Sequence, residues 1–245
     1  YIHGQWTRRL GAQLTPGGRD FPYIPEDFHQ WGEQAGRWAS ETRDYWLRFY
    51  EPKEGDTIID VGAGQGEDTL TFSRAVGASG RVIAIEAHPL SFKALKTFCR
   101  RNHLHNVTPV NVALMDRPGE VHIVESESWM ENRVETSNGS SGLSVRSATL
   151  DDLCRKEGIE DISFLKVNIE GAERYALLGA EKTMPRIRHL CVACHDFRAN
   201  QGHGEYFRTR AFVEHFLVKH GFELVSRPDD PRDYVRDHLH GSRPR

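Results

Sequence analysis

The chain has 245 residues, of which 38% are hydrophobic and 27% charged, a composition typical of a globular protein and too apolar for a disordered one. The 32 Lys and Arg residues against 35 Asp and Glu residues give a formal net charge of −3, which argues against a nucleic-acid binder because phosphates require a basic excess. No apolar run approaches the roughly 20 residues that span a bilayer, and the start of the chain shows no basic-then-apolar leader, so we expect neither a membrane span nor secretion.

The first 50 residues form an N-terminal extension ahead of the main domain. They are polar and rich in turns at first, and a helix is expected from residue 27 to residue 50. Trp31, Trp38 and Tyr45 are seven residues apart and so share one face of that helix. The helix could pack on the main domain, act as a lid over a substrate, or serve as the interface of a homodimer.

Residues 51–245 alternate short apolar runs with helix-like segments, which predicts an α/β domain with a mainly parallel central sheet and helices on both faces. The expected strands span residues 57–61, 81–86, 107–112, 119–124, 162–168 and 190–194. The expected helices cover residues 68–76, 90–102, 150–157, 172–183 and 209–220. Residues 126–148 are polar and rich in Gly and Ser and are expected to form a long loop, while residues 234–236 could form a last strand.

The four cysteines are too few to staple a domain of this size, and this usage favours the cytoplasm. Cys191 and Cys194 have the spacing of half a zinc or redox motif, yet they lie in an apolar run typical of a buried strand. Residues three apart on a strand point to opposite faces, so we favour two separate buried thiols, with a metal or redox pair as the alternative. His238 and His240 lie in a polar end of the chain and are expected at the surface.

A glycine loop after the first strand is the strongest motif. Gly62, Gly64 and Gly66 give G-x-G-x-G, and glycine permits positive φ and close approach of a ligand to the backbone. A dinucleotide fold requires G-x-G-x-x-G, but Glu67 stands where its third glycine would fall. Glu67 and Asp68 also place negative charge at the start of the helix, which suits a cationic or zwitterionic ligand better than a pyrophosphate.

Glu86 ends the next strand, 20 residues after Gly66. In nucleotide-binding α/β folds, a carboxylate at this strand tip accepts hydrogen bonds from the two ribose hydroxyls. Together with the glycine loop, Glu86 therefore indicates a ligand that contains a nucleoside.

These residues carry a family resemblance. Asp60, the glycine loop and Glu86 resemble motifs I and II of the class I methyltransferases that depend on S-adenosylmethionine (SAM). More narrowly, Glu86-Ala-His-Pro, the Thr149–Leu153 run TLDDL and the Phe164–Glu173 run FLKVNIEGAE resemble the FkbM family, over roughly residues 56–221. The resemblance implies a Rossmann-like fold and methyl transfer, usually to an oxygen of a sugar, polyketide or other small metabolite, with S-adenosylhomocysteine (SAH) as the product.

The resemblance also implies a cofactor site. The backbone of the glycine loop would cradle the methionine part of SAM, Asp60 would help to anchor its amino group, and Glu86 would grip the ribose. Residues 111–115, after the third strand, would border adenine. The expected cofactor-binding residues are Asp60, Gly62, Ala63, Gly64, Gly66, Glu86, Ala87, Asn111, Ala113 and Asn168.

The tips of two later strands carry the expected catalytic residues. His195 is the first candidate for a general base, since neutral imidazole accepts a proton near pH 7, and Asp196 or Glu170 would orient it. Alternatively, Asn168, Glu170 and Asp196 could hold Mg²⁺, which prefers oxygen ligands. Family members often carry Asp at position 168, so Asn168 removes a charge and makes a metal the less favoured option. In a third interpretation Glu170 and Glu173 stabilise the N-terminus of a helix, a structural role to which Glu173 is better suited.

We therefore expect a SAM-dependent O-methyltransferase of a small molecule in secondary metabolism. An N-methyltransferase would use the same cofactor residues. The glycine spacing disfavours a nicotinamide-dependent oxidoreductase, and Asn168 is the one feature that favours a cofactor-binding module without catalysis.

Overall fold

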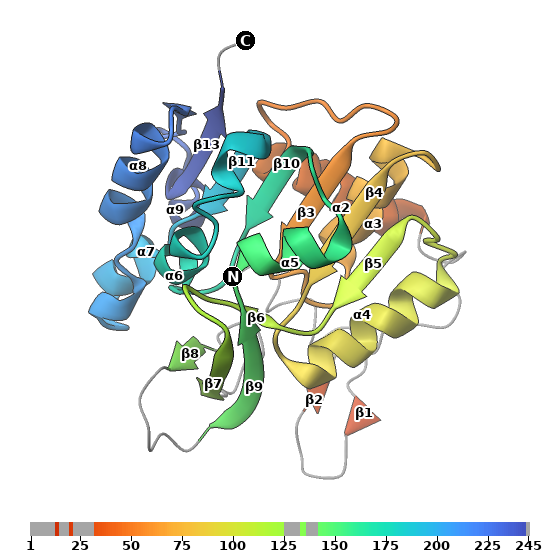
Figure 1. The fold of residues 1–245 in the computed structure, drawn as a ribbon, viewed down its shortest axis with the longest axis horizontal. Coiled ribbons are helices and arrows are strands. Elements are labelled where there is room, and N and C mark those ends of the chain that lie inside the picture. The colour runs from red at the N-terminus through yellow and green to blue at the C-terminus, as the bar shows by residue number, and fades with distance from the viewer. Residues whose placement is uncertain (1–12, 15–19, 22–31, 125–132, 136–141, 244–245) are drawn as a thin grey trace.

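The computed structural model describes residues 13–14, 20–21, 32–124, 133–135 and 142–243. Its centre is a seven-stranded sheet with helices on both faces (Figure 1). The strand order is β12-β13-β11-β10-β3-β4-β5. The bounds are β3 Thr57–Val61, β4 Arg81–Ile85, β5 Val107–Val110, β10 Ile162–Val167, β11 Ile187–Ala193, β12 Glu223–Val225 and β13 His238–Ser242.

The strands from β5 to β11 run parallel, and β13 pairs antiparallel with both of its neighbours. All six residues of β10 are buried, as expected for a central strand that helices cover on both sides. From β3 the chain builds outward through β4 and β5 and then returns to β10 on the other side of β3. The strand order therefore reverses between β3 and β10, where open α/β sheets bind their ligands.

Seven helices of the described chain cover the two faces. On one face, α5 (Leu150–Glu157), α6 (Glu173–Leu178) and α8 (Arg210–Lys219) pack on the larger apolar cluster. The other face carries α2 (Gly32–Tyr45), α3 (Glu67–Val76), α4 (Pro89–Arg101) and α9 (Asp233–Arg236). A short helix α7 (Asp196–Asn200) and two 3-10 turns (Met184–Arg186 and Glu205–Phe207) complete the connections. None of the described helices is both long and apolar enough to cross a membrane.

Helix α5 shows why local sequence fixes these bounds. The Thr149 side chain accepts a hydrogen bond from the backbone N–H of Asp152 and caps the first turn, which is acidic. Gly158 ends the helix in the left-handed conformation, with φ at 63°. The predicted bounds, 150–157, are therefore confirmed.

A second, four-stranded sheet corrects the prediction of a long loop over residues 126–148. It contains β6 (Ala113–Leu114), β7 (Gly119–Val124), β8 (Arg133–Glu135) and β9 (Leu143–Ala148), in the order β6-β9-β7-β8. In β9, Val145 and Ser147 are buried, while Ser144 and Arg146 are exposed. This alternation is that of a strand, but it was not recognised because one of the buried residues is a serine, which the sequence pattern assigned to a polar loop. The segments 125–132 and 136–141 lie outside the described residues.

The C-terminal strand was misplaced in the sequence analysis. Residues 234–236 are part of helix α9, and the last strand is β13. The first four residues of β13 are buried, and His238 and His240 are only 3% and 4% exposed, so the prediction that both lie at the surface is wrong. Imidazole counts as polar in a hydropathy pattern, which is why this strand did not stand out as an apolar run.

The four cysteines are free and buried, which confirms the prediction of two separate buried thiols at Cys191 and Cys194. Cys191 packs in the apolar cluster beneath α2, and Cys194 packs in the cluster of the opposite face. The two thiols of the C-x-x-C sequence therefore diverge.

Within the N-terminal extension, helix α2 packs against α3, and the Thr42 hydroxyl donates a hydrogen bond of 2.7 Å to Asp68. Tyr45 and Trp46 are part of the core. Trp31 lies outside the described residues. The extension also contributes the short antiparallel pair β1 (Gln13–Leu14) and β2 (Asp20–Phe21). The lid, the dimer interface and the domain boundary near residue 50 stay predictions.

Replacing Gly179 by Ala should destabilise the fold by about 1–3 kcal/mol. Gly179 follows α6 with an ordinary φ of −78°, but an added Cβ would lie 2.0 Å from the carbonyl oxygen of Met115. Gly36 is the matched control, since it is exposed within α2 with no atom near its Cβ position, and Gly36→Ala should stabilise by up to about 1 kcal/mol. Urea unfolding of both variants measures the difference. Equal stability of Gly179→Ala and the parent chain would contradict the packing argument.

Candidate active site

The glycine loop joins the end of β3 to the start of α3. Gly62, Gly64 and Gly66 have φ values of 77°, 57° and 110°, which favour glycine at each position. A Cβ on Gly62 would also lie 1.9 Å from the backbone oxygen of Asn168, the residue that follows β10. The loops after β3 and β10 therefore touch at the point where the strand order reverses, and the backbone N–H of Asn168 donates to the carbonyl of Val61.

A buried ion pair supports this loop from below. The Nζ of Lys166 lies 2.9 Å from Asp60 Oδ1 and 2.9 Å from the carbonyl oxygen of Gly62. The other oxygen of Asp60 accepts a hydrogen bond of 2.6 Å from Thr69. Because Asp60 has no exposed surface and both of its oxygens are occupied, its carboxylate shapes the loop and does not lie on the surface that a cofactor would touch.

Lys166 stays charged in this environment. Burial alone lowers the pKa of Lys166, but the negative charges of Asp60, Asp68 and Glu86 outweigh it and hold the pKa above its ordinary value. The ammonium also lies 5.1 Å from the ring centroid of Trp46, a cation–π contact from the end of α2. Sequence analysis missed Lys166, because a lysine within an apolar strand has no partner that a local pattern can reveal.

Gln65 is a second residue that the sequence analysis missed. Its side chain lies within the glycine loop with no exposed surface, and neither its oxygen nor its nitrogen has a hydrogen-bond partner among the described residues. An amide buried without partners costs about 1–3 kcal/mol for each unsatisfied group. The loop therefore holds a polar group suited to a ligand with polar atoms of its own.

Glu86 lies beside the loop at the tip of β4. Its two oxygens accept hydrogen bonds of 2.8 Å from the backbone N–H groups of Gly64 and His88. Burial raises the pKa of Glu86 to about 7, although these two N–H groups oppose the shift. The Asn111 amide donates to the carbonyls of Glu86 and Ala87 at 2.8 and 2.9 Å, and so fixes the strand tip. A carboxylate has about four acceptor positions, so Glu86 can hold the loop and still accept from hydroxyls.

The other expected cofactor residues fall around the same edge of the sheet. Ala63 is buried against α4, and Ala113 is buried in β6. Ala87 is half-buried next to Glu86. The structure therefore brings the predicted cofactor-binding residues to the carboxyl ends of β3, β4, β5 and β10.

His195 lies between two carboxylates at the tip of β11. Its Nδ1 is 2.9 Å from Glu173 Oε1, and its Nε2 is 3.3 Å from Glu170 Oε1. Arg198 Nε lies 2.8 Å from the second oxygen of Glu170. Glu173 also accepts from the backbone N–H of Gly171 and has no exposed surface. Two glutamates thus alternate with the two cations.

The charges of this cluster determine what it can do. Burial alone lowers the pKa of His195, but Glu170 and Glu173 raise it to about 10, so the ring carries a proton on both nitrogens at neutral pH. Conversely, burial alone raises the pKa of Glu170, but His195 and Arg198 hold it below its ordinary value. The group in the cluster that can accept a proton is therefore a carboxylate, while an imidazole base would first have to lose its own proton.

The backbone of this segment is strained. Glu170 has a φ of 54°, which is uncommon for a residue other than glycine and costs about 1–3 kcal/mol. Gly171 follows with φ at 97°, and a Cβ there would lie 2.4 Å from the ring of Tyr206. Such strain is concentrated at functional sites, and here it falls on the residue whose carboxylate contacts His195.

Asp196 does not join the cluster. Its carboxylate accepts hydrogen bonds of 2.9 Å from the backbone N–H groups of Thr209 and Arg210 and so stabilises the start of α8. The contact with His195 that the sequence analysis gave to Asp196 or Glu170 comes from Glu170 and Glu173. Among the described residues, neither Glu170 nor Asp196 belongs to a group of three or more His, Cys, Asp or Glu side chains placed to hold a metal ion, and a site that includes Asn168 stays a prediction.

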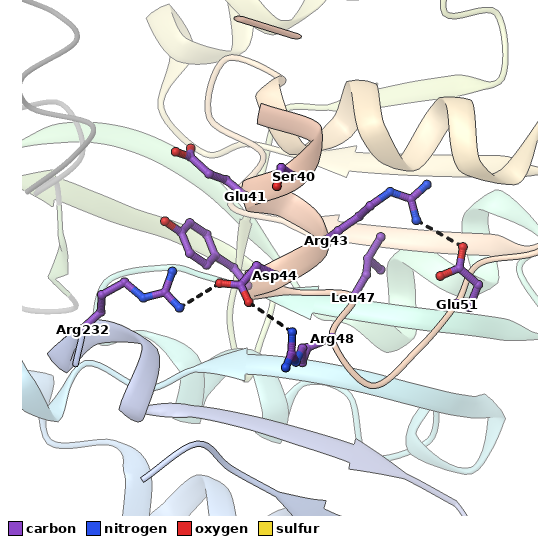
Figure 2. Close-up of a pocket in the computed structure, with 9 residues that line it drawn as sticks. Ser40, Glu41, Arg43, Asp44, Leu47, Arg48, Glu51 and Arg232 are labelled. Atoms are coloured by element: carbon purple, nitrogen blue, oxygen red, sulfur yellow. Dashed lines mark hydrogen bonds and ion pairs between the residues drawn. The ribbon is translucent and has the colours of Figure 1, made fainter. Parts of the chain in front are cut away.

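A hollow of about 650 Å³ beside α2 contains none of the predicted site residues (Figure 2). Its charges are paired: Asp44 with Arg48 and Arg232, and Arg43 with Glu51. The candidate site residues therefore lie at the sheet edge, apart from this hollow.

Comparison with known proteins identifies the family. The family model described as Methyltransferase FkbM domain matches residues 60–224, about two thirds of the chain. The chain belongs to the FkbM methyltransferase family. The 2-O-methyltransferase NoeI of Sinorhizobium fredii is 23% identical over 194 residues, which are 71% of this chain and 75% of NoeI.

Solved structures confirm the Rossmann-like class I methyltransferase fold. An FkbM methyltransferase from Methylobacillus flagellatus KT matches with a TM-score of 0.54 and 18% identity, over 79% of this chain and 45% of the solved one. An O-methyltransferase from Bacillus cereus, in complex with SAH, matches with a TM-score of 0.51 and 12% identity, over 99% of this chain and 88% of that one. The FkbM-family chain is thus a SAM-dependent methyltransferase, as the motifs implied, and it spans less than half of the solved FkbM chain.

Replacing Lys166 by Met should cost about 3–5 kcal/mol of stability, because it leaves Asp60 as a buried charge without its partner. The double variant with Asp60→Asn removes that charge and should recover part of the loss. Lys156→Met, an exposed lysine at the end of α5, is the control and should change stability by less than about 0.5 kcal/mol. Urea unfolding measures all three. A loss below about 1 kcal/mol for Lys166→Met would contradict the role of the pair.

Proposed function

We propose that this FkbM-family chain transfers the methyl group of SAM to a hydroxyl of a small molecule. One observation carries the proposal: the glycine loop contacts Asn168, in the segment before Glu170, at the point where the strand order reverses. This contact puts a candidate cofactor loop beside an ionised carboxylate. The printed name of NoeI, a 2-O-methyltransferase, supports oxygen as the acceptor atom.

The loop residues fit SAM. The cofactor supplies an electrophilic methyl group on a sulfonium. The backbone of Gly62, Gly64 and Gly66 would hold its methionine part, and the amide of Gln65, which has no partner among the described residues, would supply a hydrogen-bonding group there. Glu86 accepts from the ribose hydroxyls, while Asn111 holds the strand tip that borders the adenine. Asp60 acts from beneath the loop and supports its shape through Lys166.

The cluster at the tip of β11 serves the acceptor. Methyl transfer to a hydroxyl requires that the hydroxyl lose its proton, and the group that takes it must lie within hydrogen-bond reach. Glu170 takes this proton, because its carboxylate is ionised and partly exposed, with 19% of the side chain accessible. His195 and Arg198 position Glu170, and Glu173 holds the far side of His195. This assignment differs from a neutral His195 base, and the pH dependence of the reaction separates the two.

Two alternatives to O-methylation follow from the same residues. An amine acceptor would use the same cofactor residues and the same Glu170, and the name of NoeI is what favours oxygen. The hypothesis of a cofactor-binding module without catalysis depends on Asn168 standing in place of Asp. The observed contacts of Asn168 come from its backbone, however, and an aspartate at this position would make the same contacts. The small-molecule acceptor, the homodimer, secondary metabolism and the cytoplasmic location stay predictions.

SAH binding tests the cofactor half of the proposal. At a hundredfold excess over its Kd, a ligand stabilises by about 2.7 kcal/mol, which raises the Tm of a domain of this size by about 5–10 °C. Glu86→Gln should weaken SAH binding about 10- to 100-fold, because it replaces a charged acceptor. Since the pKa of Glu86 is about 7 and ribose hydroxyls bind its ionised form, SAH affinity should rise with pH between about 6 and 8 in the parent chain and stay flat in Glu86→Gln.

Calorimetric titration with SAH, and with NAD as the control ligand, measures these affinities. Glu160→Gln, an exposed glutamate, is the matched variant and should bind SAH normally. Unchanged SAH affinity in Glu86→Gln would refute the ribose contact, and a Tm shift with NAD instead of SAH would refute the cofactor.

Glu170→Gln should lower the rate of methyl transfer by about 10²- to 10⁴-fold with little change in SAH affinity. SAH release is followed with panels of small hydroxyl compounds and of amines. Because the pKa of Glu170 lies below its ordinary value, the carboxylate is ionised throughout neutral pH, so the rate should be flat from about pH 6 to 9 and fall in acid. A rate that instead rises toward pH 10 would show that His195, once it has lost its own proton, is the base that accepts the hydroxyl proton. Turnover with amines alone would overturn O-methylation.

A further inference from the structure

Three side chains with nitrogen or sulfur donors meet in the core beneath α2. They are Cys191 on β11 and His238 and His240 on β13, and their donor atoms all lie within 4.8 Å of one another. Their exposed fractions are 0%, 3% and 4%. In the antiparallel pairing Cys191 lies opposite His240, and His238 is two residues away on the same strand, so the pleat points all three side chains to one face.

The separation of the donors already suits a metal ion. Cys191 Sγ lies 3.7 Å from His240 Nε2. Zinc binds sulfur at about 2.3 Å and imidazole nitrogen at about 2.0–2.1 Å, so a tetrahedral site separates the two donor atoms by about 3.6 Å. No change of strand register is needed to place an ion between them.

The contacts of His238 fit a metal-binding histidine. His238 Nδ1 lies 3.3 Å from the backbone carbonyl of Tyr45. With Nδ1 as the donor in that contact, Nε2 carries the lone pair, the arrangement that orients most metal-binding histidines. Trp46 stacks on the His238 ring at 4.6 Å and covers the site.

The charged groups around the three side chains do not oppose a cation. Those that face the three side chains are Lys166, Asp68, Arg227, Asp44 and His195. Each cation has a carboxylate of its own: Lys166 pairs with Asp60, Arg227 with Asp44 at 3.1 Å, and His195 with Glu170 and Glu173. These five carboxylates outnumber the three cations, so no excess of positive charge opposes the single positive charge that a zinc ion with one thiolate adds.

We propose that Cys191, His238 and His240 form a zinc site that fastens the C-terminal strand β13 to β11. On binding, the Cys191 thiol releases its proton to solvent and its sulfur forms a bond to the ion, while the two imidazoles donate their lone pairs. The site is structural, it lies below the tip of β11, and it does not depend on the proposed methyl acceptor.

Titration of the reduced, metal-free chain with Co²⁺ tests this site, because a cobalt–thiolate bond gives a charge-transfer band in the near ultraviolet. One equivalent of Co²⁺ should produce the band, and Zn²⁺ should abolish it. Cys191→Ser should lose the band, and His238→Gln and His240→Gln should weaken Co²⁺ binding at least tenfold. Cys194→Ser is the matched control, a buried thiol three residues away on the opposite face, and it should keep the band.

The parent chain alone makes the test decisive, whether or not the variants fold. Zn²⁺ at a hundredfold excess over its Kd should raise the Tm of the parent chain by about 5–10 °C, reversed by a chelator. No band and no Zn²⁺-dependent Tm shift in the parent chain would overturn the site. A band that survives in Cys191→Ser, or that disappears in Cys194→Ser, would overturn the assignment of its ligands.

Discussion

The ion pair between Lys166 and Asp60 is the interaction on which the active site depends. It lies under the glycine loop, joins the central strands β3 and β10, and adds a hydrogen bond to the carbonyl of Gly62. A buried ion pair adds little net stability, because the desolvation of two charges offsets most of their attraction. The ion pair contributes by fixing the geometry of the loop. Lys166 and Asp60 make all of these interactions in one arrangement of the loop, so the loop has its shape before any ligand binds.

The same constraint connects the cofactor edge to the acceptor edge. Gly62 touches the backbone of Asn168, which leads into the strained φ of Glu170 and the close packing of Gly171 against Tyr206. A position so constrained cannot relax independently of its neighbours. The Glu170 carboxylate is therefore held by the backbone on one side and by His195 and Arg198 on the other. This preorganisation is what a methyl transfer requires, since the reaction depends on alignment and on one proton acceptor.

Much of the fold was predictable because its signals are local. Glycines at alternate positions after an apolar strand predicted the loop, and the predicted helix over residues 150–157 is the one that Thr149 and Gly158 bound in the structure. The prediction failed where polar residues are buried. Ser147 hid β9, and His238 and His240 hid β13, because a hydropathy pattern assigns all three to the surface. The sequence also did not predict which carboxylates contact His195. Asp196 is adjacent to His195 in the chain, yet its carboxylate caps α8, and it is Glu173 that contacts the His195 ring.

The sequence by itself determined the family, the class of fold and the positions of the glycine loop and Glu86. Each of these depends on residues a few positions apart, whose conformational freedom or strand-end placement is a local property. Only the tertiary structure decided which charges meet. Lys166 and Asp60 are 106 residues apart, and Cys191 and His240 are 49 apart. Sheet pairing brings these side chains together and burial changes their proton affinity, so the state of His195, the support of the loop and the donor cluster beneath α2 arise from the folded arrangement and not from any local pattern.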